Sequence, residues 1–197
     1  MTLTDRALKR SFDAAASLVG LVLLWPIILA AIVLARRDTG ASGLFRQVRI
    51  GRHGKPFTLL KVRTMRAVSG TTVTTAHDVR ITPLGAKFRR WKVDELPQLL
   101  NVLKGEMSFV GPRPDMPGYA DNLKGEDRIV LTLRPGITGP ATLKYRDEEQ
   151  ILAGVEDPQR YNDEVIWPEK VRINREYAEC YRFTDDLRYI WQTLRGR

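Results

Sequence analysis

The chain has 197 residues, a length that suits one compact domain with a small appendage. Its apolar fraction of 43% and charged fraction of 28% are those of a globular protein, so they exclude a largely disordered chain and a membrane protein with many spans. The net charge of +9 favours anionic partners: nucleic acid, anionic lipid headgroups or a phosphorylated substrate. A single cysteine, Cys180, excludes an intrachain disulfide and favours a reducing compartment.

An apolar segment of 22 residues, Ala14 to Ala35, contains no charged side chain. A helix of that length can cross a hydrocarbon core of about 30 Å. Pro26 lies near its centre and predicts a bend, because proline has no N–H and clashes with the preceding turn. Cations flank both ends, which indicates that both ends lie on the cytoplasmic side. These cations are Arg6, Lys9 and Arg10 before the segment and Arg36 and Arg37 after it.

We therefore expect residues 1–38 to form a re-entrant helix-break-helix that anchors the chain in the membrane. Backbone groups freed at the break need partners, which Ser17 or neighbouring protein could supply. A straight spanning helix is an alternative. A cleaved signal peptide fits less well, because its apolar region is typically about 7–15 residues long. Residues 39–197 are expected to form the cytosolic domain.

A β-hairpin is predicted over residues 45–65, with a turn at 51–56. Period-two alternation places Lys61 and Arg63 on one face of its second strand. Two such cations alone are typical of a solvated strand edge. Residues 69–77 follow as a polar run typical of a mobile loop.

Asp94 stands at the start of a leucine-patterned segment that Gly105 closes, so we expect it to be the N-cap of a helix. Pro97 is permissible in the first turn of such a helix. Capping alone contributes about 0.5–2 kcal/mol and would account for an isolated aspartate. A helix rich in cations is predicted just before it, over residues 86–91. The leucines, spaced at i, i+3, i+4 and i+7, are Leu96, Leu99, Leu100 and Leu103.

The same position also favours chemistry with anions. A helix N-terminus carries about half a positive charge, which would keep the Asp94 carboxylate ionised beside a bound phosphoryl group. Such a carboxylate could attack phosphorus, while Glu95 supplies a second metal ligand or a proton acceptor. Arg89, Arg90 and Lys92 surround the acid pair in the sequence, so this region reads as a site for a metal and phosphate.

Two proline-flanked arginines follow. In Gly111-Pro112-Arg113-Pro114 the prolines restrict the backbone on either side of Arg113, which suits bidentate phosphate recognition. The run from Arg134 to Gly139 repeats the arrangement less tightly and reads equally as a turn or a site. A last helix from Thr184 carries an apolar stripe that could lie on a bilayer or face the core. Its members are Leu187, Ile190, Trp191 and Leu194.

Four stretches together resemble the monotopic phosphoglycosyl transferases, also called bacterial sugar transferases. They are Asp94 to Leu99, the helix end from Asn101 to Gly105, Met107 to Pro114, and Lys61 to Met65. The resemblance extends from the apolar anchor to about Gly139. It implies a mostly helical α+β fold, with a re-entrant membrane helix broken at Pro26. The catalytic domain would lie at the membrane surface, with a short β-hairpin and amphipathic interfacial helices.

The resemblance also implies residue roles. Asp94 would be the nucleophile, followed by Glu95, and the two acids would bind Mg²⁺. Phosphate groups would be held by Lys61, Arg63, Arg90 and Arg113. The family pattern, a small hydroxyl residue followed by an aliphatic one before the acid pair, departs at Lys92, which precedes Val93, and a second departure is Trp25, where serine is common.

The implied reaction moves a sugar 1-phosphate from a UDP-sugar to undecaprenyl phosphate and releases UMP. The implied location is the cytoplasmic face of the bacterial inner membrane. The stretch from Trp167 to Tyr181 is rich in Tyr and Arg and could help to seat the nucleotide. Two rival functions stay open: a glycosyltransferase that releases UDP, and a membrane-tethered nucleic-acid-binding protein. No recognition-helix pattern supports the latter, so no nucleic-acid partner is expected; a homodimer is left open.

Overall fold

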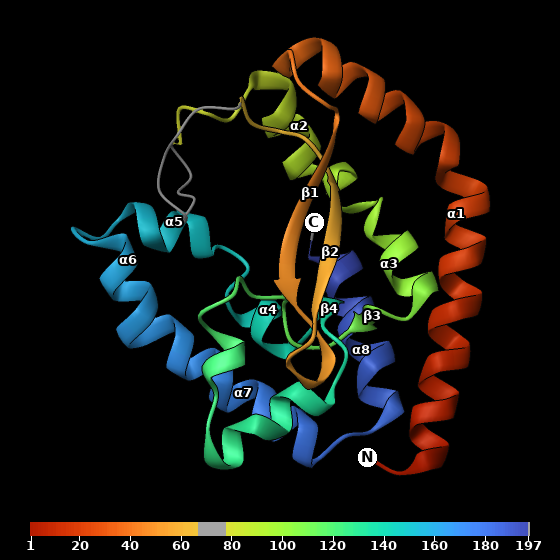
Figure 1. The fold of residues 1–197 in the computed structure, drawn as a ribbon, viewed down its shortest axis with the longest axis vertical. Helices are drawn as coiled ribbons and strands as arrows, with labels where there is room; N and C mark the ends of the chain where they lie inside the picture. The colour runs from red at the N-terminus through yellow and green to blue at the C-terminus, as the bar shows by residue number, and fades with distance from the viewer. Residues whose placement is uncertain (67–77, 197) are drawn as a thin grey trace.

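The computed structural model describes residues 1–66 and 78–196, and its largest single element is the N-terminal helix α1, Leu3–Thr39 (Figure 1). The loop predicted over 69–77 lies outside the described residues. Shorter α-helices follow it along the described residues. They are α2 (Pro83–Arg90), α3 (Gln98–Lys104), α4 (Pro140–Lys144), α5 (Glu148–Ala153), α6 (Pro158–Tyr161), α7 (Trp167–Glu179) and α8 (Phe183–Arg195).

Helix α1 bends without a break in its helical structure. Thr2 caps its start by accepting a hydrogen bond from the Asp5 N–H, and Gly40 ends it with φ of 71°. Pro26 lies inside the helix, whose lower and upper parts run in different directions in Figure 1. The expected helix-break-helix is thus one bent helix. Proline removes a single hydrogen bond of the ladder, and the turns on either side continue it.

The middle of α1 projects apolar side chains away from the protein. Val22, Leu23 and Trp25 are 64%, 70% and 60% exposed. By length and composition the helix could cross a membrane, and only 11% of its most apolar window is buried. Exposure of such an apolar face to water is unfavourable, so we expect an apolar environment around it.

The first turns of α1 are fixed to the rest of the protein by polar contacts. The Lys9 ammonium lies 2.5 Å from the buried Asp186 carboxylate of α8. The Arg10 guanidinium donates two hydrogen bonds of 2.7 Å to the last-turn carbonyls of α3. The Asp13 carboxylate accepts a hydrogen bond from the Phe109 N–H. Two cations that the sequence suggested as a membrane flank therefore bind protein groups.

The predicted hairpin is present. Strands β1 (Leu44–Ile50) and β2 (Pro56–Val62) pair antiparallel, with Leu44 opposite Val62. The second strand ends three residues before Met65, which instead forms an isolated bridge with Ile81. A second sheet, which the sequence analysis did not predict, pairs β3 (Ser108–Val110) with β4 (Gly136–Thr138) in parallel.

Three glycines allow the backbones around β3 and β4 to approach closely. A Cβ atom on Gly111 would lie 2.2 Å from the Arg134 carbonyl oxygen. One on Gly136 would lie 2.2 Å from the Gly111 nitrogen, and one on Gly139 would lie 2.4 Å from the Gly111 oxygen. Such separations exclude any side chain there. The run from Arg134 to Gly139 is therefore structural.

Two apolar clusters contain residues of α7 and join it to the segments around it. Helix α8 lies beside the second of them, and its predicted stripe divides between two environments. Ile190 packs against this cluster, whereas Leu187, Trp191 and Leu194 are 43%, 55% and 57% exposed. The buried members are Ile50, Ala120, Leu123, Val130, Leu131 and Val171 in the first cluster and Val110, Leu133, Tyr177, Ala178 and Tyr181 in the second.

Candidate active site

Asp94 lies in a tight 3₁₀ turn, Val93–Glu95, between α2 and α3. Lys92 opens this turn in the left-handed conformation, with φ of 56°, which costs a non-glycine residue about 1–3 kcal/mol. Helix α3 begins only at Gln98, because Pro97 has no N–H to continue a ladder from the turn. The predicted N-cap role of Asp94 is therefore wrong, since Pro97 occupies that position.

The Asp94 carboxyl group is buried yet borders a cavity. Its residue is 7% exposed, and its Oδ1 atom has no hydrogen-bond partner among the described residues. Burial, with the negative charge of Glu95, raises the pKa of Asp94 to about 6, against the opposing charges of Lys61, Lys92 and Arg89. Burial thus outweighs the stabilisation of the anion that the sequence analysis expected at a helix start.

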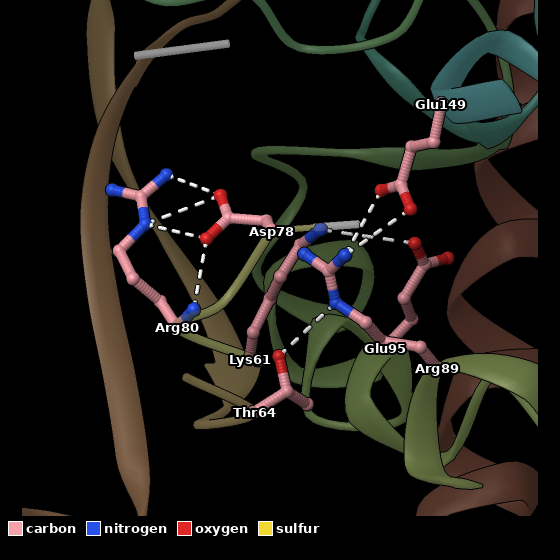
Figure 2. Close-up of polar contacts among 7 residues, drawn as sticks. All are labelled: Lys61, Thr64, Asp78, Arg80, Arg89, Glu95 and Glu149. Carbon is pink, nitrogen blue, oxygen red and sulfur yellow. Dashed lines mark hydrogen bonds and ion pairs between the residues drawn. The ribbon is translucent and has the colours of Figure 1, made fainter. Parts of the chain in front are cut away.

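Glu95 has the opposite electrostatic environment. Its carboxylate Oε1 lies 3.7 Å from the Lys61 Nζ atom of β2, as Figure 2 shows. Burial alone would raise the pKa of Glu95, but the positive charges of Lys61 and Arg113 outweigh it and lower the pKa. Two neighbouring acids with pKa values moved apart can serve different roles, one as an anion held by cations and one as a reactive carboxylate.

The cavity beside Asp94 has a volume of about 540 Å³ and is rich in cations. Among the residues that the structure describes, eight Lys and Arg side chains line it against four acids. Such an excess of positive charge favours a multiply charged anion. The cations are Arg49, Lys61, Arg63, Arg66, Arg80, Arg89, Arg113 and Lys170, and the acids are Asp94, Asp115, Glu148 and Glu149.

Arg89 joins α2 to α5 at this cavity. Its Nη1 atom donates to both carboxylate oxygens of Glu149, at 3.0 and 3.2 Å, and its Nε atom donates to the Thr64 hydroxyl at 3.2 Å (Figure 2). An Asp78–Arg80 ion pair lies in the same view. The cation of α2 that faces the cavity is thus already paired with an acid.

The structure brings together most of the predicted site residues. Lys61, Arg63 and Arg113 line the cavity with Asp94, and Glu95 contacts Lys61. Arg63 also donates to the Ser42 carbonyl, and its guanidinium lies 5.2 Å from the centre of the Phe45 ring. Arg90 is exposed and does not line the cavity, whereas the neighbouring Arg89 does.

Seven charged residues of the cavity were missed: Arg49, Arg66, Arg80, Asp115, Glu148, Glu149 and Lys170. Two carried a signal in the sequence. Arg49 is part of the predicted hairpin, and Asp115 follows Arg113 by two residues in an extended, proline-fixed segment, so both side chains point the same way. Glu148 and Glu149 of α5 and Lys170 of α7 reach the cavity only through the tertiary structure.

Asp94 and Glu95 are suited to hold Mg²⁺ together with a phosphorylated ligand. Mg²⁺ is commonly bound through one or two carboxylates, several waters and substrate phosphates. Residues 1–66 and 78–196 contain no cluster of three or more His, Cys, Asp or Glu side chains that could hold a metal by itself. The unpartnered Oδ1 of Asp94 and the adjacent carboxylate of Glu95 fit this mode of binding.

Comparison with known proteins identifies the family of the chain. The bacterial sugar transferase family model matches residues 4–196. The chain is 37% identical over 191 residues to the uncharacterized sugar transferase EpsL of Bacillus subtilis, covering 95% of this chain and 86% of that protein. It is 32% identical over 192 residues to the UDP-glucose:undecaprenyl-phosphate glucose-1-phosphate transferase of Caulobacter vibrioides, covering 94% and 68%. With nearly its whole length matched, the chain belongs to the bacterial sugar transferase family.

Proposed function

We propose that the protein transfers a sugar 1-phosphate from a UDP-sugar to undecaprenyl phosphate, through a covalent intermediate on Asp94. The observation that carries this proposal is the buried carboxyl group of Asp94, which lines a cation-rich cavity and has one oxygen without a hydrogen-bond partner among the described residues. An oxygen without a hydrogen bond keeps its lone pairs available for attack. The names of the relatives, several of which act on undecaprenyl phosphate, support the classes of donor and acceptor.

In the first half-reaction, Asp94 attacks the phosphorus that bears the sugar. A bond forms between a carboxylate oxygen of Asp94 and phosphorus, and the bond from phosphorus to the bridging oxygen breaks, so UMP leaves with the electron pair. Lys61 and Arg113 offset the negative charge of the diphosphate. Mg²⁺, held by Asp94 and Glu95, would neutralise the diphosphate and stabilise the leaving phosphate.

In the second half-reaction, a phosphate oxygen of undecaprenyl phosphate attacks the same phosphorus and displaces the Asp94 carboxylate. The product is undecaprenyl diphosphate sugar, and the enzyme returns to its starting state. One carboxylate serves both steps, so the kinetics are ping-pong. Because the acceptor is a lipid, the cavity must lie near a bilayer, and the apolar face of α1 supplies the membrane association. We place the catalytic domain on the cytoplasmic face, anchored by α1 as a re-entrant helix.

The proposal is tested with purified protein in detergent, a panel of UDP-sugars, undecaprenyl phosphate and Mg²⁺, by measuring UMP release. The wild-type protein should release UMP with one or more donors and should become covalently labelled by a radioactive donor without acceptor. Asp94→Asn should lower turnover by at least about 1,000-fold and abolish labelling. Glu156→Gln, which changes an exposed acid outside the cavity, is the control and should be fully active. Normal turnover by Asp94→Asn, or release of UDP, would contradict the proposal.

A further inference from the structure

The cavity is lined by residues of both α2 and α7, which lie apart in Figure 1. The charges of Lys61 and Arg89 act on Asp94, and we call these three residues the α2 end. The charge of Lys170, on α7, acts on Asp115, and we call these two residues and Trp167 the α7 end. Arg113 lies between them, since its charge interacts with Glu95 and Asp94 as well as with Asp115 and Glu148. The reaction at Asp94 uses the α2 end and Arg113, which leaves the α7 end without an assigned ligand.

Asp115 is held over the α7 end by its backbone. Its carbonyl oxygen accepts a hydrogen bond of 2.9 Å from the Ile50 N–H of β1, and the preceding Pro114 carbonyl accepts one of 3.2 Å from Arg49. Pro114 further restricts the segment, because its ring fixes φ. The backbone of Asp115 is therefore held by the hairpin.

This carboxylate has no hydrogen bond or close ion pair to any residue in the described parts of the chain. Burial raises the pKa of Asp115 to about 7, even though the charges of Lys170, Arg49 and Arg113 oppose the rise. A partly buried acid that lacks partners is costly to the fold. Its hydrogen-bonding capacity is free for a ligand in the cavity.

The ligand group beside Asp115 should be a hydroxyl. A phosphate would be repelled by a carboxylate, whereas a hydroxyl can donate to it, and a vicinal diol can donate twice. The nearby Lys170 is paired with Glu148 at 2.6 Å, so this end carries little net positive charge. Trp167 adds an aromatic surface, packed edge-to-face on Tyr119 with ring centres 5.3 Å apart.

The direction of attack indicates which hydroxyls reach Asp115. In phosphoryl transfer the attacking and leaving oxygens lie roughly in line through phosphorus. With Asp94 at one end and Arg113 beside the phosphates, the leaving UMP extends away from Asp94, toward the α7 end. A nucleoside offers a ribose diol for the carboxylate and a base whose face can stack on an aromatic ring.

On the basis of the proposed function, we propose that the α7 end is the nucleoside subsite. The Asp115 carboxylate accepts hydrogen bonds from the ribose hydroxyls, and the uracil ring lies against Trp167. Asp115 is then a binding residue that selects ribonucleotides and holds the leaving group in line with Asp94.

The test measures binding of UMP and of 2′,3′-dideoxy-UMP by calorimetry, with no acceptor present. The wild-type protein should bind UMP more tightly than the dideoxy compound by about 10- to 100-fold, as expected for hydrogen bonds to a charged group. Asp115→Ala should reduce this preference to about onefold while its affinity for dideoxy-UMP stays within about twofold of wild type. Trp167→Leu should weaken both nucleotides by the same factor, and the exposed acid variant Glu156→Gln should change neither.

Several outcomes would overturn the inference. If Asp115→Ala still binds UMP more tightly than dideoxy-UMP, the ribose hydroxyls do not bind this carboxylate. If Asp115→Ala binds UMP normally and weakens only UDP-sugars, the acid faces the transferred sugar instead. The binding assay needs no turnover, so a missing covalent intermediate would refute the proposed reaction without altering this result.

Discussion

Asp186 and Asp94 are both buried aspartates, but their surroundings differ. Asp186, which is 2% exposed, lies beside the Lys9 ammonium, and its carboxylate accepts hydrogen bonds from the hydroxyls of Tyr177 and Tyr181. Asp94, which is 7% exposed, lines the cavity, and its Oδ1 has no partner among the described residues. The first aspartate joins α1 to α8, and the second is available to a ligand. The role of a buried acid therefore follows from its hydrogen-bonding partners and its access to a cavity, taken together.

Asp13 shows that a missing partner alone is insufficient. One of its oxygens accepts from the Phe109 N–H, and the other has no partner in the described structure, as with Asp94. Asp13 is 1% exposed and does not line the cavity. No substrate can reach it from there, so its unpartnered oxygen has a structural consequence only. Access to the cavity separates Asp94 from Asp13.

The largest change in stability is expected at Asp186. Asp186→Asn removes the anion opposite Lys9 and leaves a buried ammonium without a counter-charge, which costs about 3–5 kcal/mol. Urea unfolding of the detergent-solubilised protein, followed by circular dichroism, measures the loss. Adding Lys9→Met to this variant should recover part of the stability, because the unpaired charge is gone. A loss below about 1 kcal/mol would mean that this contact does not hold α1 in place.

The same substitution at Asp94 should act in the opposite direction. The pKa of Asp94 is raised to about 6 in the folded protein, so the protonated form adds stability that is present below about pH 4 and lost as the pH rises through about 6. Asp94→Asn imitates the protonated form. At pH 7 the variant should be more stable by up to about 3 kcal/mol, and at pH 4 the difference should vanish.

Unfolding at several pH values between 4 and 8 tests this expectation. A destabilised Asp94→Asn at pH 7 would show that the carboxylate has stabilising partners in the folded state. The comparison with Asp186 would then fail, because both acids would be structural.

Local patterns in the sequence were enough to predict the hairpin, helix α2 and the end of α3 at Gly105. These features depend on neighbouring residues: alternation along strands, and a glycine at φ of 83° that ends a helix. The turn at Asp94 was harder, because the leucine pattern continues backwards across Pro97 while the hydrogen-bonded helix starts after it. Helical periodicity indicates which face of a helix is apolar, but it does not determine the residue at which the helix begins.

Long-range contacts set the remainder of the site. The cavity combines β1, β2, α2, the segment after Arg113, α5 and α7. Lys9 illustrates the same difficulty, since its partner Asp186 is 177 residues away. A cation beside an apolar segment is typical of a membrane flank, and only the folded chain shows that this one is buried against α8. Period two on β1 could have added Arg49 to the site, because it shares a face with Phe45 and Gln47.

The smallest effect is expected at the Arg89–Glu149 pair, which places an acid of α5 on a cation of the cavity. Both side chains are partly exposed, at 25% and 50%, so the pair contributes only about 0.2–1 kcal/mol. A donor phosphate competes with Glu149 for the same guanidinium. Glu149→Gln should therefore lower the KM for the donor by up to about fivefold at low salt, with little effect at about 1 M salt, where charges are screened.

The matched control for Glu149 is Glu164→Gln, which breaks the exposed Arg160–Glu164 pair away from the cavity. It should leave the KM unchanged at every salt concentration. If Glu149→Gln instead raises the KM, the acid supports the bound donor by holding Arg89 in place. The two variants remove the same charge, so any difference in their KM values comes from the position of the acid. Only Glu149 is paired with a cation, Arg89, that the donor phosphate is proposed to bind. An acid at the cavity can thus compete with the substrate anion for a cation, whereas Asp94 is proposed to react with that anion.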